Sequence, residues 1–163
     1  MKSDLEEKLD QAARHEAAHV VVKHIVAKFV PITKVWIDPK GHHPQGSPLV
    51  VPFPENLDRH YLRPTVKEAI MYLLAGDVQD QIDNRRESDA SREDEEALCL
   101  AFQAERKDLT KAKILRERAR QKVQALLSEP RHQSAVKALA NALVERLCLP
   151  GDEALEIVRH ALQ

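Results

Sequence analysis

Two histidines that flank a glutamate are the residues of this chain best spaced to act together. The segment reads His15-Glu16-Ala17-Ala18-His19. On a helix, positions i and i+4 share a face, so both imidazoles can reach one ion. Neutral imidazole is a good ligand for zinc, and two of them supply half of a tetrahedral site. The spacing therefore predicts that His15 and His19 bind a Zn²⁺ ion.

The glutamate inside this segment has the position of a general base. On a helix Glu16 projects beside the face that carries the two imidazoles. A zinc ion lowers the pKa of a bound water from about 15.7 to near 7, so hydroxide becomes accessible at neutral pH. Glu16 can take the proton of that water and later pass it to a leaving amine. The predicted chemistry is metal-assisted hydrolysis of an amide.

A catalytic zinc ion also needs a third protein ligand and one open position. The best source is an acidic cluster at the start of a predicted helix. Acidic residues in a first helical turn are also stabilised by the helix dipole, so any single one of them can instead be a solvated residue. The cluster consists of Glu87, Asp89, Glu93, Asp94, Glu95 and Glu96.

These residues must be positioned by elements that the apolar periodicity and the prolines define. Ser3 and Glu6 form an S-x-x-E capping box at the start of a first helix, and Pro31 ends it. Residues 32–38 alternate apolar and polar side chains as a strand does, and residues 48–53 predict a short edge strand. The predicted helices span residues 3–29, 65–83, 91–104, 109–127, 131–148 and 151–162.

Length and composition suit one helix-rich domain. The 163 residues are enough to bury a core without disulfides or metals as staples. We expect a single domain, 1–163, with a zinc-site region over 1–104 and a C-terminal helical part over 105–163. The expected fold class is α+β and mostly helical, namely a HExxH zincin-like helical domain with a small β-hairpin or sheet and a C-terminal helical bundle.

The charge balance and the ends of the chain argue against several classes of partner. The formal net charge is −1, which favours neither nucleic acid nor an anionic membrane as the main partner. The two cysteines form no CxxC pair, so a disulfide framework is not expected. The N-terminus lacks the apolar core of a signal peptide, and no apolar run is long enough to span a bilayer. We therefore expect a cytoplasmic protein.

Several segments together resemble the peptidase domain of the FtsH family of zinc proteases. Ala13–His19 is similar to that family's HEAGH helix, with Ala18 in place of its glycine, and 32–41 is similar to its strand HKVTIIPRG. The resemblance covers about residues 10 to 162. Its other segments are Pro52–Glu55, Leu74–Asp80, Asp89–Asp94, Ala125–Arg131, Leu139–Ala140, Leu143–Glu145 and Gly151–Glu153.

The resemblance implies a third zinc ligand, a substrate site and a class of substrate. The family's third ligand is an Asp, and residue identity selects Asp94, whereas aligning the apolar stripe of Ala97 and Ala101 selects Glu93. Asp94 is preferred and Glu93 is the alternative. A peptide substrate is expected to lie beside the strand that contains Leu49, Val50 and Val51.

The chain contains no glycine-rich phosphate loop. We therefore expect ATP-independent cleavage of flexible or unfolded polypeptides, with an ATPase partner in trans or a homo-oligomer as further possibilities.

Two other functions compete with this prediction. The first is a catalytically inactive, metallopeptidase-like module that binds or regulates. The second is nucleic-acid binding, because the stretch 106–122 carries many Lys and Arg residues. A solvated helix face that offsets the preceding acidic segment is the simpler explanation of that stretch.

Overall fold

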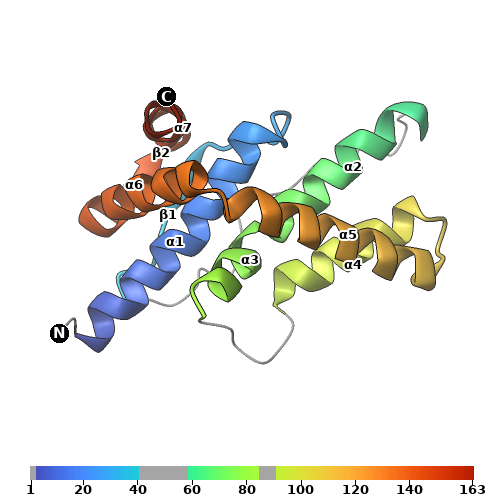
Figure 1. The fold of residues 1–163 in the computed structure, drawn as a ribbon, viewed down its shortest axis with the longest axis horizontal. Helices are drawn as coiled ribbons and strands as arrows, with labels where there is room; N and C mark the ends of the chain where they lie inside the picture. The colour runs from blue at the N-terminus through green and yellow to red at the C-terminus, as the bar shows by residue number, and fades with distance from the viewer. Residues whose placement is uncertain (1–2, 41–58, 85–90) are drawn as a thin grey trace.

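The computed structural model describes residues 3–40, 59–84 and 91–163, with the backbone alone at 59–64. Over these residues the chain is mostly helical with one small antiparallel sheet (Figure 1), which confirms the expected α+β class at this level. The elements are α1 (Asp4–Ile25), β1 (Lys34–Trp36), α2 (Arg59–Leu73), α3 (Ala75–Ile82), α4 (Arg92–Ala104), α5 (Leu109–Leu127), α6 (Pro130–Arg146), β2 (Cys148–Pro150) and α7 (Gly151–Ala161).

The capping box predicted at the start of α1 is present. The backbone N–H of Glu6 donates to Ser3 Oγ at 3.2 Å, and the backbone N–H of Ser3 donates to Glu6 Oε2 at 2.6 Å. At the other end, α1 stops at Ile25 rather than at residue 29 as predicted. The N–H groups of Val26 and Ala27 both donate to the carbonyl of Val22, so this carbonyl at the helix end is satisfied before the chain enters β1.

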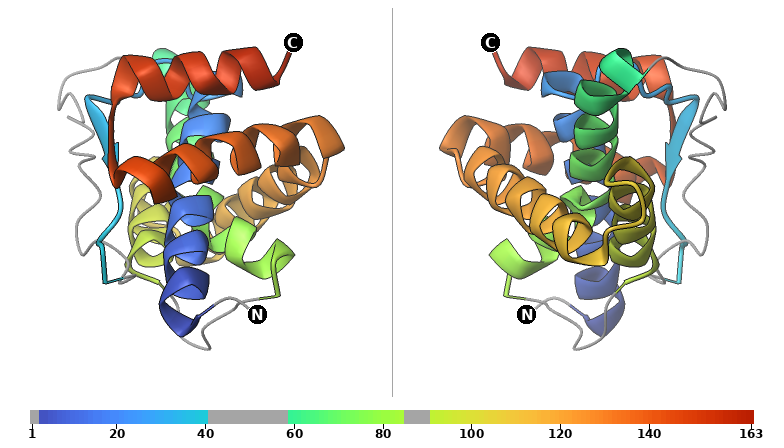
Figure 2. Two further views of the ribbon diagram at one scale, coloured as in Figure 1. Left: turned by 90° about the vertical axis from the view of Figure 1, so that its left-hand side faces the viewer. Right: turned by 90° about the vertical axis from the view of Figure 1, so that its right-hand side faces the viewer.

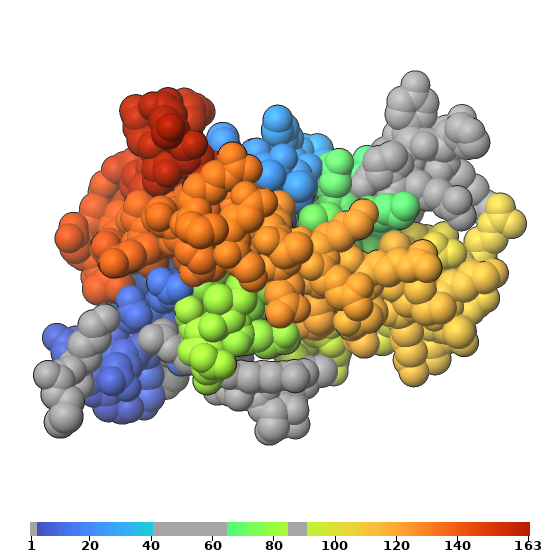
Figure 3. Space-filling model, viewed as in Figure 1, coloured from blue at the N-terminus to red at the C-terminus, as the bar shows by residue number. Residues whose placement is uncertain are grey.

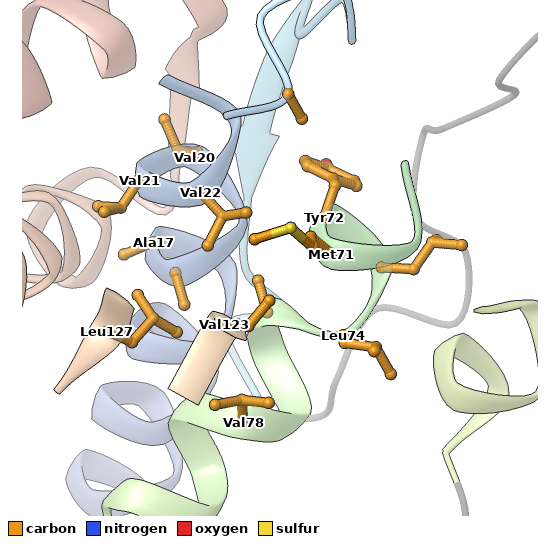
Figure 4. Packing of buried hydrophobic residues seen from close by; sticks show 14 of the residues in the cluster. Ala17, Val20, Val21, Val22, Met71, Tyr72, Leu74, Val78, Val123 and Leu127 are labelled. Carbon is orange, nitrogen blue, oxygen red and sulfur yellow. The ribbon is translucent and has the colours of Figure 1, made fainter. Parts of the chain in front are cut away.

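The buried face of α1 is built from small side chains, and this allows close packing. Ala17, Val20, Val21 and Val22 are fully buried. Around them lie Val78 of α3, Val123 and Leu127 of α5, and residues at the end of α2 (Figure 4). The helix also packs against α6 and α7, which cross it in two further layers (Figures 1 and 2). The two histidines proposed as metal ligands therefore lie on the central helix of the fold.

The predicted helix over 65–83 is two helices, α2 and α3, which meet at Leu74. The N–H of Leu74 still donates to Ile70 O at 3.1 Å, and the N–H of Val78 donates to Leu74 O at 3.0 Å. The chain therefore changes direction without leaving helical hydrogen bonding at this residue. The change of direction brings α3 against α1 and α5 (Figure 3 shows α3 beside both).

The sheet joins distant parts of the chain. β1 pairs antiparallel with β2, in the register Lys34↔Pro150, Val35↔Leu149 and Trp36↔Cys148. The sequence predicted only a Pro-Gly break between two helices at the position of β2. The predicted strand over 48–53 lies outside the described residues.

The C-terminal helices follow the prediction closely. α5 has the predicted bounds, and Pro130 occupies the first position of α6, where its missing N–H costs nothing. α5, α6 and α7 contact α1 as well as their neighbours in the chain, so the zinc-site region and the C-terminal part share one core. Within the described residues, every helix is too short or too polar to cross a membrane.

Candidate metal centre

The two histidines of α1 point into the interior beside each other. His15 and His19 are 5% and 3% exposed, and their ring centroids are 5.1 Å apart. The side chain of Glu93, from the first turn of α4, approaches both rings. Its Oε2 lies 3.1 Å from His15 Nε2, and its Oε1 lies 3.6 Å from His19 Nε2. Two imidazole nitrogens and one carboxylate thus face a common point.

The Nδ1 atom of each ring has an acceptor of its own. His15 Nδ1 lies 2.8 Å from Asp80 Oδ2 of α3, and His19 Nδ1 lies 2.7 Å from the backbone carbonyl of Tyr72. Both of these oxygens can only accept, so Nδ1 of each ring carries the proton. In the neutral imidazole, Nε2 then keeps its lone pair for a metal ion. This carboxylate or carbonyl support is characteristic of metal-binding histidines.

Asp94, the preferred third ligand of the sequence analysis, does not approach the imidazoles. Its carboxylate is bound by two arginines of α5: Arg116 Nη1 donates to Oδ2 at 2.9 Å, and Arg120 Nη2 donates to Oδ1. Glu93, the alternative, is the carboxylate that faces the two rings. The geometry therefore favours Glu93 as the candidate third ligand, in place of the Asp94 preferred from the sequence. Successive side chains on a helix point about 100° apart, so only one of them can face α1.

A glycine of α3 allows the close approach of the first imidazole. A Cβ atom at Gly76 would lie 2.1 Å from His15 Nε2 and 2.3 Å from its Cε1. Such distances are far below van der Waals contact, so only glycine leaves room for the ring where it lies. α3 therefore supports His15 twice, with Asp80 behind the ring and Gly76 against its face.

The groups of the site shift one another's pKa strongly. Burial alone would lower the pKa of His15, but the hydrogen bonds and charges of Asp80 and Glu93 outweigh it and raise this pKa well above its ordinary value. The pKa of His19 is likewise raised, with the charge of Glu93 overcoming the effect of burial. Burial would raise the pKa of Glu93, but the two imidazoles lower it far below its usual range. The carboxylates of Asp80 and Glu93 thus favour a positive charge at the site, carried either by protons on the imidazoles or by a metal ion.

Glu16, the predicted general base, lies at a pocket next to the histidines. It lines, together with His19, a pocket beside β1. Burial raises the pKa of its carboxyl, and the charges of the imidazoles oppose that effect. The rest of the pocket wall is mainly apolar and consists of Val20, Pro31, Ile32, Thr33, Lys34, Val35, Trp36 and Tyr72. The predicted substrate residues Leu49, Val50 and Val51 lie outside the described residues.

The residues present fit a zinc ion. The ligand atoms of His15, His19 and Glu93 all lie within 4.8 Å of one another, and two nitrogens with one oxygen form a common ligand set for zinc. The Nε2 of His19 is buried and makes no hydrogen bond with any described residue. A buried nitrogen without a hydrogen bond is costly, and a metal ion at this point would satisfy it.

Three supporting groups were not identified from the sequence: Asp80, Gly76 and the carbonyl of Tyr72. All three lie in or next to Leu74–Asp80, which the sequence analysis used only as a sign of family resemblance. One signal was available, because Asp77 and Asp80 are three residues apart and so share a helix face. Which backbone carbonyl accepts from an imidazole cannot be read from residue types.

No protein-family model matches this chain, and no curated protein matches its sequence. Any assignment of function therefore depends on the geometry of the site itself.

Proposed function

We propose that this chain is a zinc-dependent metallopeptidase of the zincin type, similar to the FtsH peptidase domain. His15, His19 and Glu93 hold the ion, and Glu16 is the general base. One observation carries the proposal: a single carboxylate faces the Nε2 atoms of two buried imidazoles, and the Nδ1 atoms of both are already engaged. A purely structural role for these histidines does not require that arrangement.

A zinc ion bound here would supply a Lewis acid that polarises a carbonyl and makes water acidic near neutral pH. The proton transfers of the proposed reaction are assigned to Glu16. Its burial keeps the affinity of the carboxylate for a proton above that of an exposed glutamate, so it can accept a proton from water and return it to the leaving nitrogen. Glu16 lies on the helical turn that carries both imidazoles, so the proton acceptor and the metal ligands form one rigid unit.

The pocket supports a polypeptide as the substrate. Glu16 and His19 lie at one wall, and β1 residues and Tyr72 form much of the remainder. An apolar wall beside a strand suits a peptide in extended conformation, with its side chains in contact with the wall. A substrate segment can reach Glu16 only if it separates from the rest of its own protein. The proposed substrates are therefore flexible or unfolded polypeptides.

The decisive experiment compares the wild type with Glu16→Gln. We expect stoichiometric zinc in both, measured by elemental analysis after dialysis. Cleavage of a chemically unfolded, fluorescently labelled protein should fall about 10²- to 10⁴-fold in the variant, the range for loss of a general base. Glu7→Gln, an exposed glutamate of the same helix, is the matched control and should change neither quantity.

Two results would contradict the proposal. If the wild type binds zinc but cleaves nothing, the inactive binding module becomes the better explanation. If it binds no zinc at all, the metal centre itself is refuted.

A further inference from the structure

The first turn of α4 carries two adjacent carboxylates with different partners. Glu93 faces the imidazoles of α1, and Asp94 faces the guanidinium groups of α5. On a helix these two side chains point about 100° apart, so the rotation of α4 about its axis decides which of them reaches the metal centre. Whatever fixes that rotation selects the third ligand.

Asp94 is held by two arginines that lie one helical turn apart. Arg116 bonds one carboxylate oxygen, and Arg120 bonds the other. The carboxylate is 10% exposed, and the arginine side chains are 24% and 17% exposed, so all three charges are largely removed from water. Breaking such a pair would leave a largely buried charge without its counter-charge, which is costly.

A second contact fixes the same turn to α3. Ser91 caps α4 by accepting from the backbone N–H of Asp94 at 3.1 Å. Its hydroxyl also donates to Asp77, which lies on α3 between Gly76 and Asp80. The start of α4 is thus attached on one side to the helix that supports His15 and on the other side to the arginines of α5.

Rotation of α4 toward an Asp94-bound centre would be costly. It would leave Arg116 and Arg120 without their carboxylate and would withdraw Glu93 from the two imidazoles. The small residues Ala97 and Ala101, both fully buried, would also leave their packing positions. In the rotation observed, Asp94 meets both arginines while Glu93 faces both imidazoles.

We propose that Arg116 and Arg120 are positioning residues for the metal centre, and that they select Glu93 as a ligand by binding Asp94. The inference rests on the proposed zinc site, and it assigns a role to two basic residues that do not touch that site. It also accounts for part of the basic stretch of α5 without any nucleic-acid partner.

The test measures zinc affinity by competition with a chromophoric chelator, alongside the melting temperature of the zinc-free protein. The variants are Arg116→Ala with Arg120→Ala, Asp94→Asn, and all three changes together. We expect the arginine double variant to bind zinc on the order of 10- to 100-fold more weakly, the usual cost of losing a supporting contact. In the Asp94→Asn background the arginine substitutions should add little, because they act through Asp94.

The sign of the effect separates positioning from simple electrostatics. Removing two positive charges near a cation site would by Coulomb's law strengthen zinc binding, whereas loss of positioning weakens it. Arg118→Ala, an exposed arginine of the same helix, is the matched control and should leave the affinity unchanged. If the double variant does not fold, Arg116→Ala and Arg120→Ala made singly keep the same sign test, because each removes a positive charge.

Unchanged or stronger zinc binding in folded arginine or Asp94 variants would overturn the inference while the metal centre stands. A lower melting temperature with unchanged affinity would mean that the arginines only stabilise the fold, and it would overturn the inference equally. If the wild type takes up no zinc, the proposed function fails first and the inference falls with it.

Discussion

Gly76→Ala is the sharpest test of the site's geometry, because it adds one methyl group and removes no polar atom. The new Cβ would lie 2.1 Å, 2.3 Å and 2.4 Å from His15 Nε2, Cε1 and Cδ2. Carbon contacts normally begin near 3.5 Å, so the ring must retreat by more than about 1 Å. The tolerance of a functional site is about 0.5 Å. We therefore expect His15 to lose its place as a ligand.

The retreat also strains the contacts that hold the ring. Nδ1 lies 2.8 Å from Asp80, and Nε2 lies 3.1 Å from Glu93, so a shift of that size stretches at least one contact beyond hydrogen-bond range. Zinc affinity should fall more than about 100-fold, the upper end of the cost of losing a supporting group. Overpacking should also cost about 1–3 kcal/mol of stability, although alanine is the better helix former.

The assay is zinc titration against a chelator, with a thermal melt of the same samples. Gly151→Ala provides the matched control. Gly151 begins α7, and a Cβ atom there would lie 1.9 Å from the carbonyl oxygen of Ile32, so this variant is overpacked against Ile32 rather than against an imidazole. That variant should lose stability and keep its zinc affinity. If Gly76→Ala binds zinc as tightly as the wild type, the imidazole does not lie against α3 as described, and the reasoning is refuted.

Three further predictions concern the imidazoles and the groups around them. Asp80→Asn leaves the ring of His15 with a weaker acceptor at Nδ1, and zinc affinity should fall about 10- to 100-fold. The control is Asp83→Asn: this carboxylate binds Arg14 instead, so its loss should leave zinc affinity unchanged. In the zinc-free protein, the raised pKa values of His15 and His19 stabilise the fold fully below about pH 6.5, and this stability is lost as pH rises through the folded values. The melting temperature measured with a chelator present should therefore fall as pH is raised above that range, and a flat profile would contradict the assignment. Zinc uptake should release protons, because both rings must be neutral to bind the ion, and calorimetry in buffers of different ionisation enthalpy measures that release.

Much of the secondary structure could be predicted from the sequence, because local rules decide it. The capping box at Ser3, the proline at the start of α6 and the apolar period of α5 each act within a few residues. β2 was missed for the opposite reason. Three residues between two helices become a strand only because β1, more than a hundred positions earlier, lies beside them.

The sequence by itself determined which residues could do chemistry: two imidazoles one turn apart, a carboxylate between them and an acidic cluster further along. The resemblance that it carries narrowed the candidates for the third ligand to two adjacent residues, with Asp94 preferred over Glu93. Only the tertiary structure shows that Glu93 faces the two imidazoles while Asp94 faces Arg116 and Arg120 of α5. The spacing of side chains along a helix follows from the sequence of that segment alone. Which of those side chains points at the site depends on the groups of the other helices around it.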